Sequence, residues 1–188
     1  LLKLLITCCV LLILIPSTKG QKINQERLNL LSDKYAKTSF PMLKDLLSIP
    51  NDAFYPADIE KNIAWCEQAF QKRSFQTTRI STETVPLLLA ERKSKKAKKT
   101  VLIYLQLDGQ PVDTTKWFQE NPYKPALKRE TSNGEWEEIP WSEIDNYDDD
   151  WRIFARSTSD AKGPVAMFLA ALDAIEEENI EPNFNIKI

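Results

Sequence analysis

Two acidic side chains lie where the sequence predicts a ligand crevice. Asp108 closely follows an apolar run rich in strand formers at 100–105, and Asp160 comes just before an amphipathic helical pattern at 162–178. In open α/β sheets, ligands bind outside the carboxyl ends of the strands, so both carboxylates are expected at the same edge of one sheet. Each acid also has a structural interpretation, because Asp160 stands where a helix N-cap is expected and Asp108 suits a turn.

The elements that would position these acids follow from the apolar periodicity. Helical spacing at 22–49 predicts one helix bent at Pro41, or two helices, and the same spacing at 58–73 predicts another. Four segments have the composition of strands, at 75–81, 85–91, 100–105 and 183–188. The run at 100–105 is almost wholly apolar, which predicts a strand buried on both faces.

Residues 113–150 have no sustained period. They predict a long irregular excursion, with short strands around 126–129 and 151–155. We expect an incomplete α/β domain in which the strands at 100–105 and 183–188 share one sheet, joined by a connection that includes the helix at 162–178.

The N-terminal residues have the pattern of a secretory signal peptide. An apolar run at 1–15 carries an early cation, Lys3, and is followed by small and polar residues up to Gly20. Its apolar core is too short for a membrane-spanning helix, so a stable membrane anchor is not expected. We predict a signal peptide at 1–20, cleavage near Gly20, and a secreted or periplasmic protein.

Charge and cysteine content narrow the function classes. The formal net charge of the 188 residues is −2, with both signs mixed along the chain, which argues against binding to nucleic acid. After the predicted cleavage Cys66 would be the only cysteine, so no disulfide within the chain is expected. Cys66 is expected to be a small buried residue on a helix.

Two short motifs occur in order along the chain. The first is LQLDGQPVD at 105–113, followed by Trp117, and the second is FARSTSDAKGP at 154–164. They resemble the metal-site motifs of the M20 metallopeptidases, especially the dipeptidase-like branch, which read His-x-Asp and Gly-Arg-Gly-x-x-Asp-x-Lys-Gly. The resemblance implies a three-layer αβα sandwich of the zinc-exopeptidase type. Residues 21–188 are expected to be the N-terminal part of its catalytic domain.

The resemblance also implies roles for three residues. Asp160 matches the carboxylate that bridges two zinc ions, and Asp108 matches the catalytic-site acid that orients a neighbouring histidine ligand. Gln106 stands in place of that histidine, and its neutral amide is a weaker zinc ligand than an imidazole. One metal position is therefore expected to be weak or empty. We predict one tightly held zinc ion per full-length chain, rather than two.

Other positions of the second motif either keep or change the family pattern. Lys162 and Gly163 match it, and they are expected to hold the turn and the start of the helix rather than a metal ion. Ala155 and Ser157 replace its two glycines. These replacements remove freedom to adopt positive φ and are expected to reshape the turn before Asp160.

Two functions fit this pattern. The first is a metal-dependent hydrolase that uses a metal-activated water on the peptide or amide bond of small peptides or N-acyl amino acids. Its general base and remaining ligands are expected beyond Ile188, so residues 1–188 alone are expected to be inactive. The second is a noncatalytic relative that binds a peptide or a partner, which the exchange at Gln106 favours. The resemblance further implies a homodimer formed through a lid domain outside this sequence.

Overall fold

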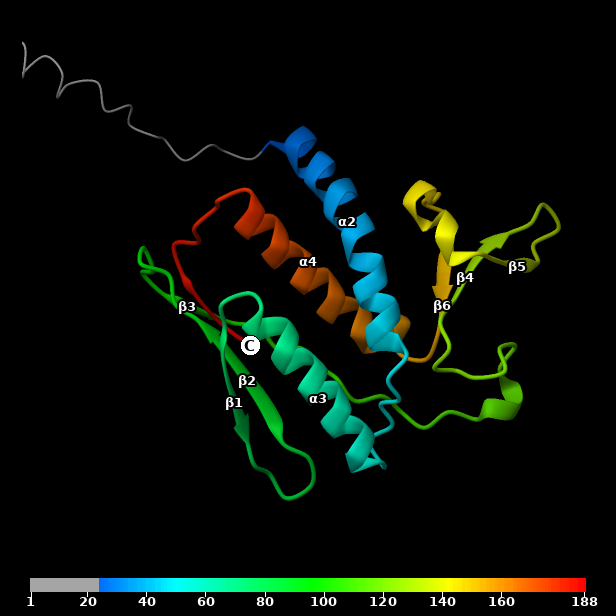
Figure 1. The fold of residues 1–188 in the computed structure, drawn as a ribbon, viewed down its shortest axis with the longest axis horizontal. Helices are drawn as coiled ribbons and strands as arrows, with labels where there is room; N and C mark the ends of the chain where they lie inside the picture. Colours follow the sequence, from blue (N-terminus) through cyan, green and yellow to red (C-terminus); the bar gives the residue numbers. More distant parts are fainter. Residues whose placement is uncertain (1–23) are drawn as a thin grey trace, which may run out of the picture. The chain divides into compact units, whose positions relative to one another are not determined.

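The computed structural model describes residues 24–188, and the predicted signal peptide at 1–20 lies outside the described residues. The chain divides into two compact units after Leu30. In the first unit, the described part contains only the opening turns of helix α2 (Gln25–Leu47). Leu31–Ile188 form the second unit, which contains the other elements (Figure 1). Within 24–188, no helix combines the length and the apolar character needed to cross a membrane.

A four-stranded mixed sheet is the centre of the second unit. Its order is β1-β2-β7-β3, with bounds β1 (Gln76–Ile80), β2 (Leu87–Arg92), β7 (Asn185–Lys187) and β3 (Thr100–Leu102). β3 and β7 run parallel, with Val101 opposite Ile186, whereas β2 is antiparallel to both β1 and β7. The prediction that the segments at 100–105 and 183–188 share one sheet is confirmed.

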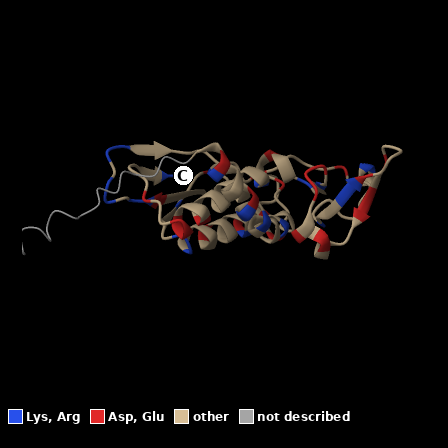
Figure 2. Cartoon of the chain, turned by 90° about the horizontal axis from the view of Figure 1, so that it is seen from above, with Lys and Arg blue, Asp and Glu red and all other residues tan. Residues whose placement is uncertain are grey.

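A smaller antiparallel sheet lies within the irregular excursion. Its order is β5-β4-β6, with bounds β4 (Ala126–Glu130), β5 (Trp136–Ile139) and β6 (Arg152–Phe154). Lys128 and Arg129 of β4 lie opposite Glu138 and Glu137 of β5, so basic and acidic strands face each other in Figure 2. Opposite charges on paired strands stabilise the register. β5 was not predicted, because its sequence WEEI lacks an alternating apolar pattern.

The helices differ little from the expected ones. α2 continues through Pro41 as one helix, and α3 (Pro56–Gln71) begins at Pro56, where the missing N–H would have had no helical partner. α4 (Gly163–Glu177) follows a kinked turn, η3 (Thr158–Lys162), in which Asp160 and Ala161 are not helical. Two 3-10 helices, η1 (Thr114–Lys116) and η2 (Trp141–Asn146), lie in the excursion.

The helices and the sheet share one core. It contains Leu46 of α2, Phe70 of α3, Leu169 of α4 and Ile186 of β7, all at most 3% exposed. Cys66, as expected, is buried on α3, and it belongs to the same core. The predicted α/β class is confirmed.

Only one face of the sheet is covered by the described residues. Ile103 and Leu105 pack against the core, but Leu102 is 71% exposed and Tyr104 is 84% exposed. The prediction of a strand buried on both faces is therefore wrong for the described part of the chain. An apolar run shows that a strand can be covered twice, and it cannot show that a second covering layer is present. The described residues supply the sheet and one helical layer of the expected sandwich.

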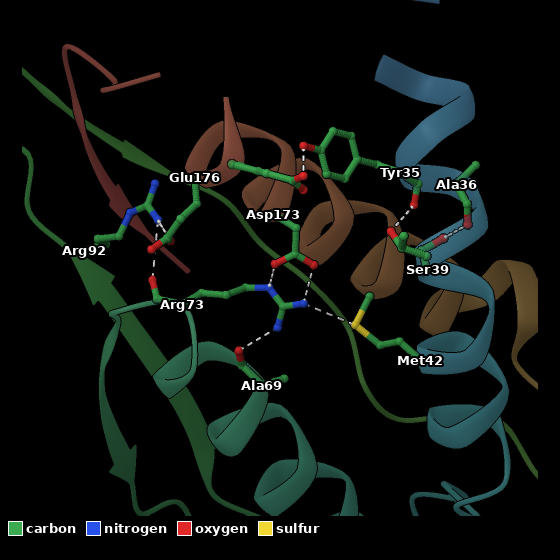
Figure 3. A network of polar contacts seen from close by, with 11 residues as sticks. Tyr35, Ala36, Ser39, Met42, Ala69, Arg73, Arg92, Asp173 and Glu176 are labelled. Atoms are coloured by element: carbon green, nitrogen blue, oxygen red, sulfur yellow. Dashed lines mark hydrogen bonds and ion pairs between the residues drawn. The ribbon is translucent and has the colours of Figure 1, made fainter. Parts of the chain in front are cut away.

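Arg73 follows the C-terminal end of α3 and connects this helix to α4 through hydrogen bonds (Figure 3). Its Nε and Nη2 atoms each donate a 2.6 Å hydrogen bond to the carboxylate of Asp173, and its Nη1 donates to the carbonyl oxygen of Ala69 at 2.8 Å. The Arg73 side chain is 13% exposed. Arg92 donates to the carbonyl oxygen of Arg73 at 3.4 Å and lies 3.7 Å from the carboxylate of Glu176. The Asp173 side chain is 39% exposed, so the largely buried partner of this two-bonded ion pair is the arginine. Two parallel hydrogen bonds make such a pair stronger than an ordinary surface pair.

We expect Arg73→Ala to lower the free energy of unfolding by about 2 kcal/mol, because it removes a largely buried side chain with its hydrogen bonds to Asp173 and to the Ala69 carbonyl oxygen. Urea denaturation measures this loss. Arg79→Ala is the matched control. Arg79 also pairs with two acids, Glu60 and Glu67, but its side chain is 39% exposed, so the loss should stay below about 1 kcal/mol. Equal losses in the two variants would contradict the prediction.

Candidate metal and substrate site

The chain leaves β3 in an extended line that runs to Gly109. Side chains along this line alternate, because successive residues of an extended chain point to opposite sides. Leu105 and Leu107 pack against the core, whereas Gln106 and Asp108 are exposed. Gln106 and Asp108 therefore lie on the same side of the chain, away from the core.

Asp160 lies in the η3 turn, just before α4. Its backbone is not helical, with φ −125° and ψ 98°, and the N-cap position of α4 is taken by Lys162. The structure gives the Asp160 carboxylate no hydrogen bond or ion pair with residues 24–188. The interpretation of Asp160 as an N-cap is therefore wrong. The carboxylate of Asp108 likewise has no such partner there, so it does not stabilise a turn.

One pocket brings the predicted site residues together. It has a volume of about 430 Å³, and Gln106, Asp108 and Asp160 all line it. Trp117 and Arg156 are among the other residues that line it. Two segments far apart in the chain therefore present exposed carboxylates to one cavity, at the edge where the strand and helix pattern placed them.

The pocket residues suit a divalent cation but do not complete a site for one. Carboxylate oxygens are common metal ligands, and the amide oxygen of Gln106 is a weaker one. Zinc sites use three or four protein ligands. Among residues 24–188, no three His, Cys, Asp or Glu side chains are close enough to hold one ion. These residues thus fit one wall of a metal site.

Lys162 holds the turn next to Asp160, as expected from the motif. It is fully buried, and its Nζ donates to the carbonyl oxygens of Leu46, at 2.8 Å, and Ile49. These carbonyl groups lie at the C-terminal end of α2, where a cation is favoured. Burial nevertheless lowers the pKa of Lys162 to about 7, and it raises the pKa of the nearby Cys66 thiol to about 12.

The turn before Asp160 keeps a backbone conformation that favours glycine. Ser157 has φ 65° and ψ 18°, in the left-handed region. The expectation that Ser157 removes the positive φ is therefore wrong. A non-glycine residue in this region costs about 1 kcal/mol, so other contacts of Ser157 must offset the strain. Gly163 cannot be replaced in the same way, because a Cβ there would lie 2.3 Å from the carbonyl oxygen of Thr158.

Two residues of the site region were not singled out from the sequence. Arg156 lines the same pocket as the two carboxylates, and its Nε is buried without a hydrogen-bond partner in the described chain. The sequence could have indicated Arg156, because this residue lies inside the second motif. Asn51 is fully buried and donates to the carbonyl oxygen of Leu107 at 2.8 Å. No periodicity marks Asn51, because it lies in the short connection between α2 and α3.

No protein-family model matches the sequence. Several solved structures are similar to the chain over most of its length. Human carnosine dipeptidase 1 superposes with a TM-score of 0.60 and 22% identity over 86% of this chain. The M20 family metallo-carboxypeptidase Sso-CP2 from Sulfolobus solfataricus gives 0.60 and 26% over 79%. The dipeptidase Dug1p from Saccharomyces cerevisiae gives 0.58 and 18% over 84%.

The match covers only part of each of these proteins. The chain spans 32%, 29% and 33% of their lengths, in the same order. At these identities the likeness is one of fold. The chain therefore has the α/β fold of part of the M20-type metallopeptidases and dipeptidases.

Proposed function

We propose that the protein carrying this chain is a metal-dependent hydrolase that cleaves a peptide or amide bond. One observation carries the proposal. Asp108 and Asp160 come from separate segments to line one pocket, and neither carboxylate has a partner within residues 24–188. Exposed carboxylates without internal partners are free to meet a cation. The fold shared with metallopeptidases supports this chemistry.

In this proposal each pocket residue has a distinct task. Asp160 would be a zinc ligand, Asp108 would orient a neighbouring ligand, and Gln106 would be a weak ligand. Bound zinc would polarise the carbonyl group of the substrate and activate a water molecule. Arg156 adds a positive charge to the same wall, which lowers the repulsion between the two carboxylates. The further ligands and the general base would come from outside the described residues.

The proposed substrates are small peptides or N-acyl amino acids. The proposed setting is outside the cytoplasm, after removal of residues 1–20, and the proposed assembly is a homodimer. A second candidate function is noncatalytic binding, because Gln106 lines the pocket at the position where the motif has histidine. A noncatalytic protein that binds a peptide or a partner would keep this pocket without needing a full ligand set.

Metal content distinguishes the two functions. We expect the complete protein to purify with about one tightly held zinc ion per chain, because open catalytic sites work with three protein ligands and a water. Gln106→His should raise the content toward two, since the new imidazole would lie beside Asp108, which can orient it. Elemental analysis after gel filtration measures the zinc content of the wild-type protein and of the Gln106→His variant.

Gln110→His is the matched control, because Gln110 lines the same pocket and lies outside the proposed ligand set. Its zinc content should stay at the wild-type level. Two tightly held ions in the wild-type protein would show that Gln106, or a substitute, binds well. Absence of zinc from all three proteins, together with no hydrolysis of dipeptides, would favour the noncatalytic function.

A further inference from the structure

A buried polar pair connects the two segments that carry Asp108 and Asp160. Asn51 is 0% exposed and Ser157 is 6% exposed. Asn51 Nδ2 donates to Ser157 Oγ at 3.1 Å, and the Ser157 hydroxyl donates to Asn51 Oδ1 at 3.2 Å. Asn51 Nδ2 also donates to the carbonyl oxygen of Leu107 at 2.8 Å. The amide of Asn51 therefore uses both its donor and its acceptor atoms inside the protein.

The main chain around Asn51 is tied to the same strand end. Gly109 N–H donates to the carbonyl oxygen of Asn51 at 2.7 Å, and Ala53 N–H donates to the carbonyl oxygen of Gly109 at 3.3 Å. Asp108 thus lies between two residues, Leu107 and Gly109, that are both bonded to the segment at 51–53. Because both neighbours are held by these hydrogen bonds, the backbone of Asp108 has little freedom to move.

Close packing makes these contacts dependent on one another. A Cβ on Gly109 would lie 2.6 Å from Ser157 Oγ and 3.0 Å from both polar atoms of the Asn51 side chain. Ser157 is held in the left-handed conformation at the start of the turn that carries Asp160. A glycine at 157 would adopt this conformation without strain but would lack the hydroxyl that bonds Asn51.

We propose that Asn51 and Ser157 are positioning residues, forming a buried clamp that sets the Asp108 segment against the Asp160 turn. Asn51 does not line the pocket, and Ser157 lines it but is 6% exposed, with its hydroxyl group bonded to the Asn51 amide. The clamp acts through the backbone of Leu107, Gly109 and the η3 turn. Its consequence for metal binding rests on the proposed function, whereas its effect on the local backbone does not.

Two variants at one position separate the hydroxyl group from the backbone strain. Ser157→Gly removes the hydroxyl and relieves the strain, and Ser157→Ala removes the hydroxyl and keeps the strain. We expect Ser157→Ala to have a clearly lower unfolding midpoint than Ser157→Gly, which should remain close to wild type. Both variants should show at least about tenfold faster hydrogen exchange in the peptide that contains Gly109, because the clamp is broken in each.

Zinc affinity of the complete protein is the second readout. Both Ser157 variants should bind zinc about tenfold more weakly, in the range found when residues that orient ligands are replaced. Asn51→Asp should weaken binding further, because it puts a carboxylate oxygen opposite the carbonyl oxygen of Leu107. Arg73→Ala is the control, since it lowers stability away from the pocket and should leave zinc affinity unchanged.

The outcomes separate the clamp from the proposed function. Unchanged exchange of the Gly109 peptide in both Ser157 variants would overturn the clamp. Faster exchange with unchanged zinc affinity would show that the contacts do not position the site, and this also overturns the proposal. If the wild-type protein binds no zinc, the proposed function fails, and the exchange rates alone then decide whether Asn51 and Ser157 hold the two segments together.

Discussion

Asp160→Ala is expected to abolish zinc retention by the complete protein. The carboxylate of Asp160 lines the pocket, is exposed and has no partner among the described residues, so the variant removes a ligand in the proposed site and little else. Replacing a residue that merely orients a ligand already costs about 10- to 100-fold in affinity, and the loss of a ligand shared by both proposed metal positions should cost more. Elemental analysis after gel filtration measures the zinc that remains.

Two further measurements make this result specific. The metal-free Asp160→Ala protein should unfold within about 0.5 kcal/mol of the metal-free wild type, because no internal contact is lost. Asp108→Asn should weaken zinc binding without abolishing it, since the proposed role of Asp108 is to orient a ligand. Full zinc content in Asp160→Ala, with normal stability, would remove Asp160 from the ligand set.

Lys162→Ala is expected to lower the free energy of unfolding by about 4 kcal/mol. The Lys162 side chain is fully buried, so its removal leaves a cavity. The carbonyl oxygens of Leu46 and Ile49 would also lose a donor at the end of α2. Each buried carbonyl left without a hydrogen bond adds about 1 kcal/mol or more. Urea denaturation of the wild type and the variant gives the difference.

Lys162→Met separates the cavity from the charge. Methionine fills much of the same volume, and it removes a cation that burial disfavours, as the lowered pKa of about 7 for Lys162 indicates. Replacing a buried charge with an apolar side chain is often close to neutral, so this variant should retain about 2 kcal/mol more stability than Lys162→Ala. Equal losses in the two variants would show that the hydrogen bonds, and not the filled volume, dominate.

Local patterns in the sequence predicted most of the fold. The helical spacing at 58–73 and 162–178 corresponds to α3 and α4, and the runs at 100–105 and 183–188 contain the parallel pair β3 and β7. These elements could be predicted because the burial of one face imposes a period on the residues of the same segment. β5 was missed because it is paired through charged side chains, which leave no apolar period.

The candidate site was predicted in part. Gln106, Asp108 and Asp160 were selected by their motifs and by their positions at a strand end and before a helix, and the structure places all three around one pocket. The interpretation of Asp160 as an N-cap failed because Asp160 lies inside the η3 turn, and Lys162 takes the N-cap position of α4. Whether a residue caps a helix depends on one or two backbone angles, which a residue type alone does not determine.

By itself, the sequence determined which residues could do chemistry, the order of the elements that carry them, and the replacement of the motif histidine by Gln106. Only the tertiary structure decided what holds those residues in place. Asn51, Ser157 and Lys162 act through contacts with segments far away in the chain, and such contacts leave no local pattern. The exposed face of β3 was decided in the same way, because burial depends on whether another layer packs there, and not on the composition of the strand.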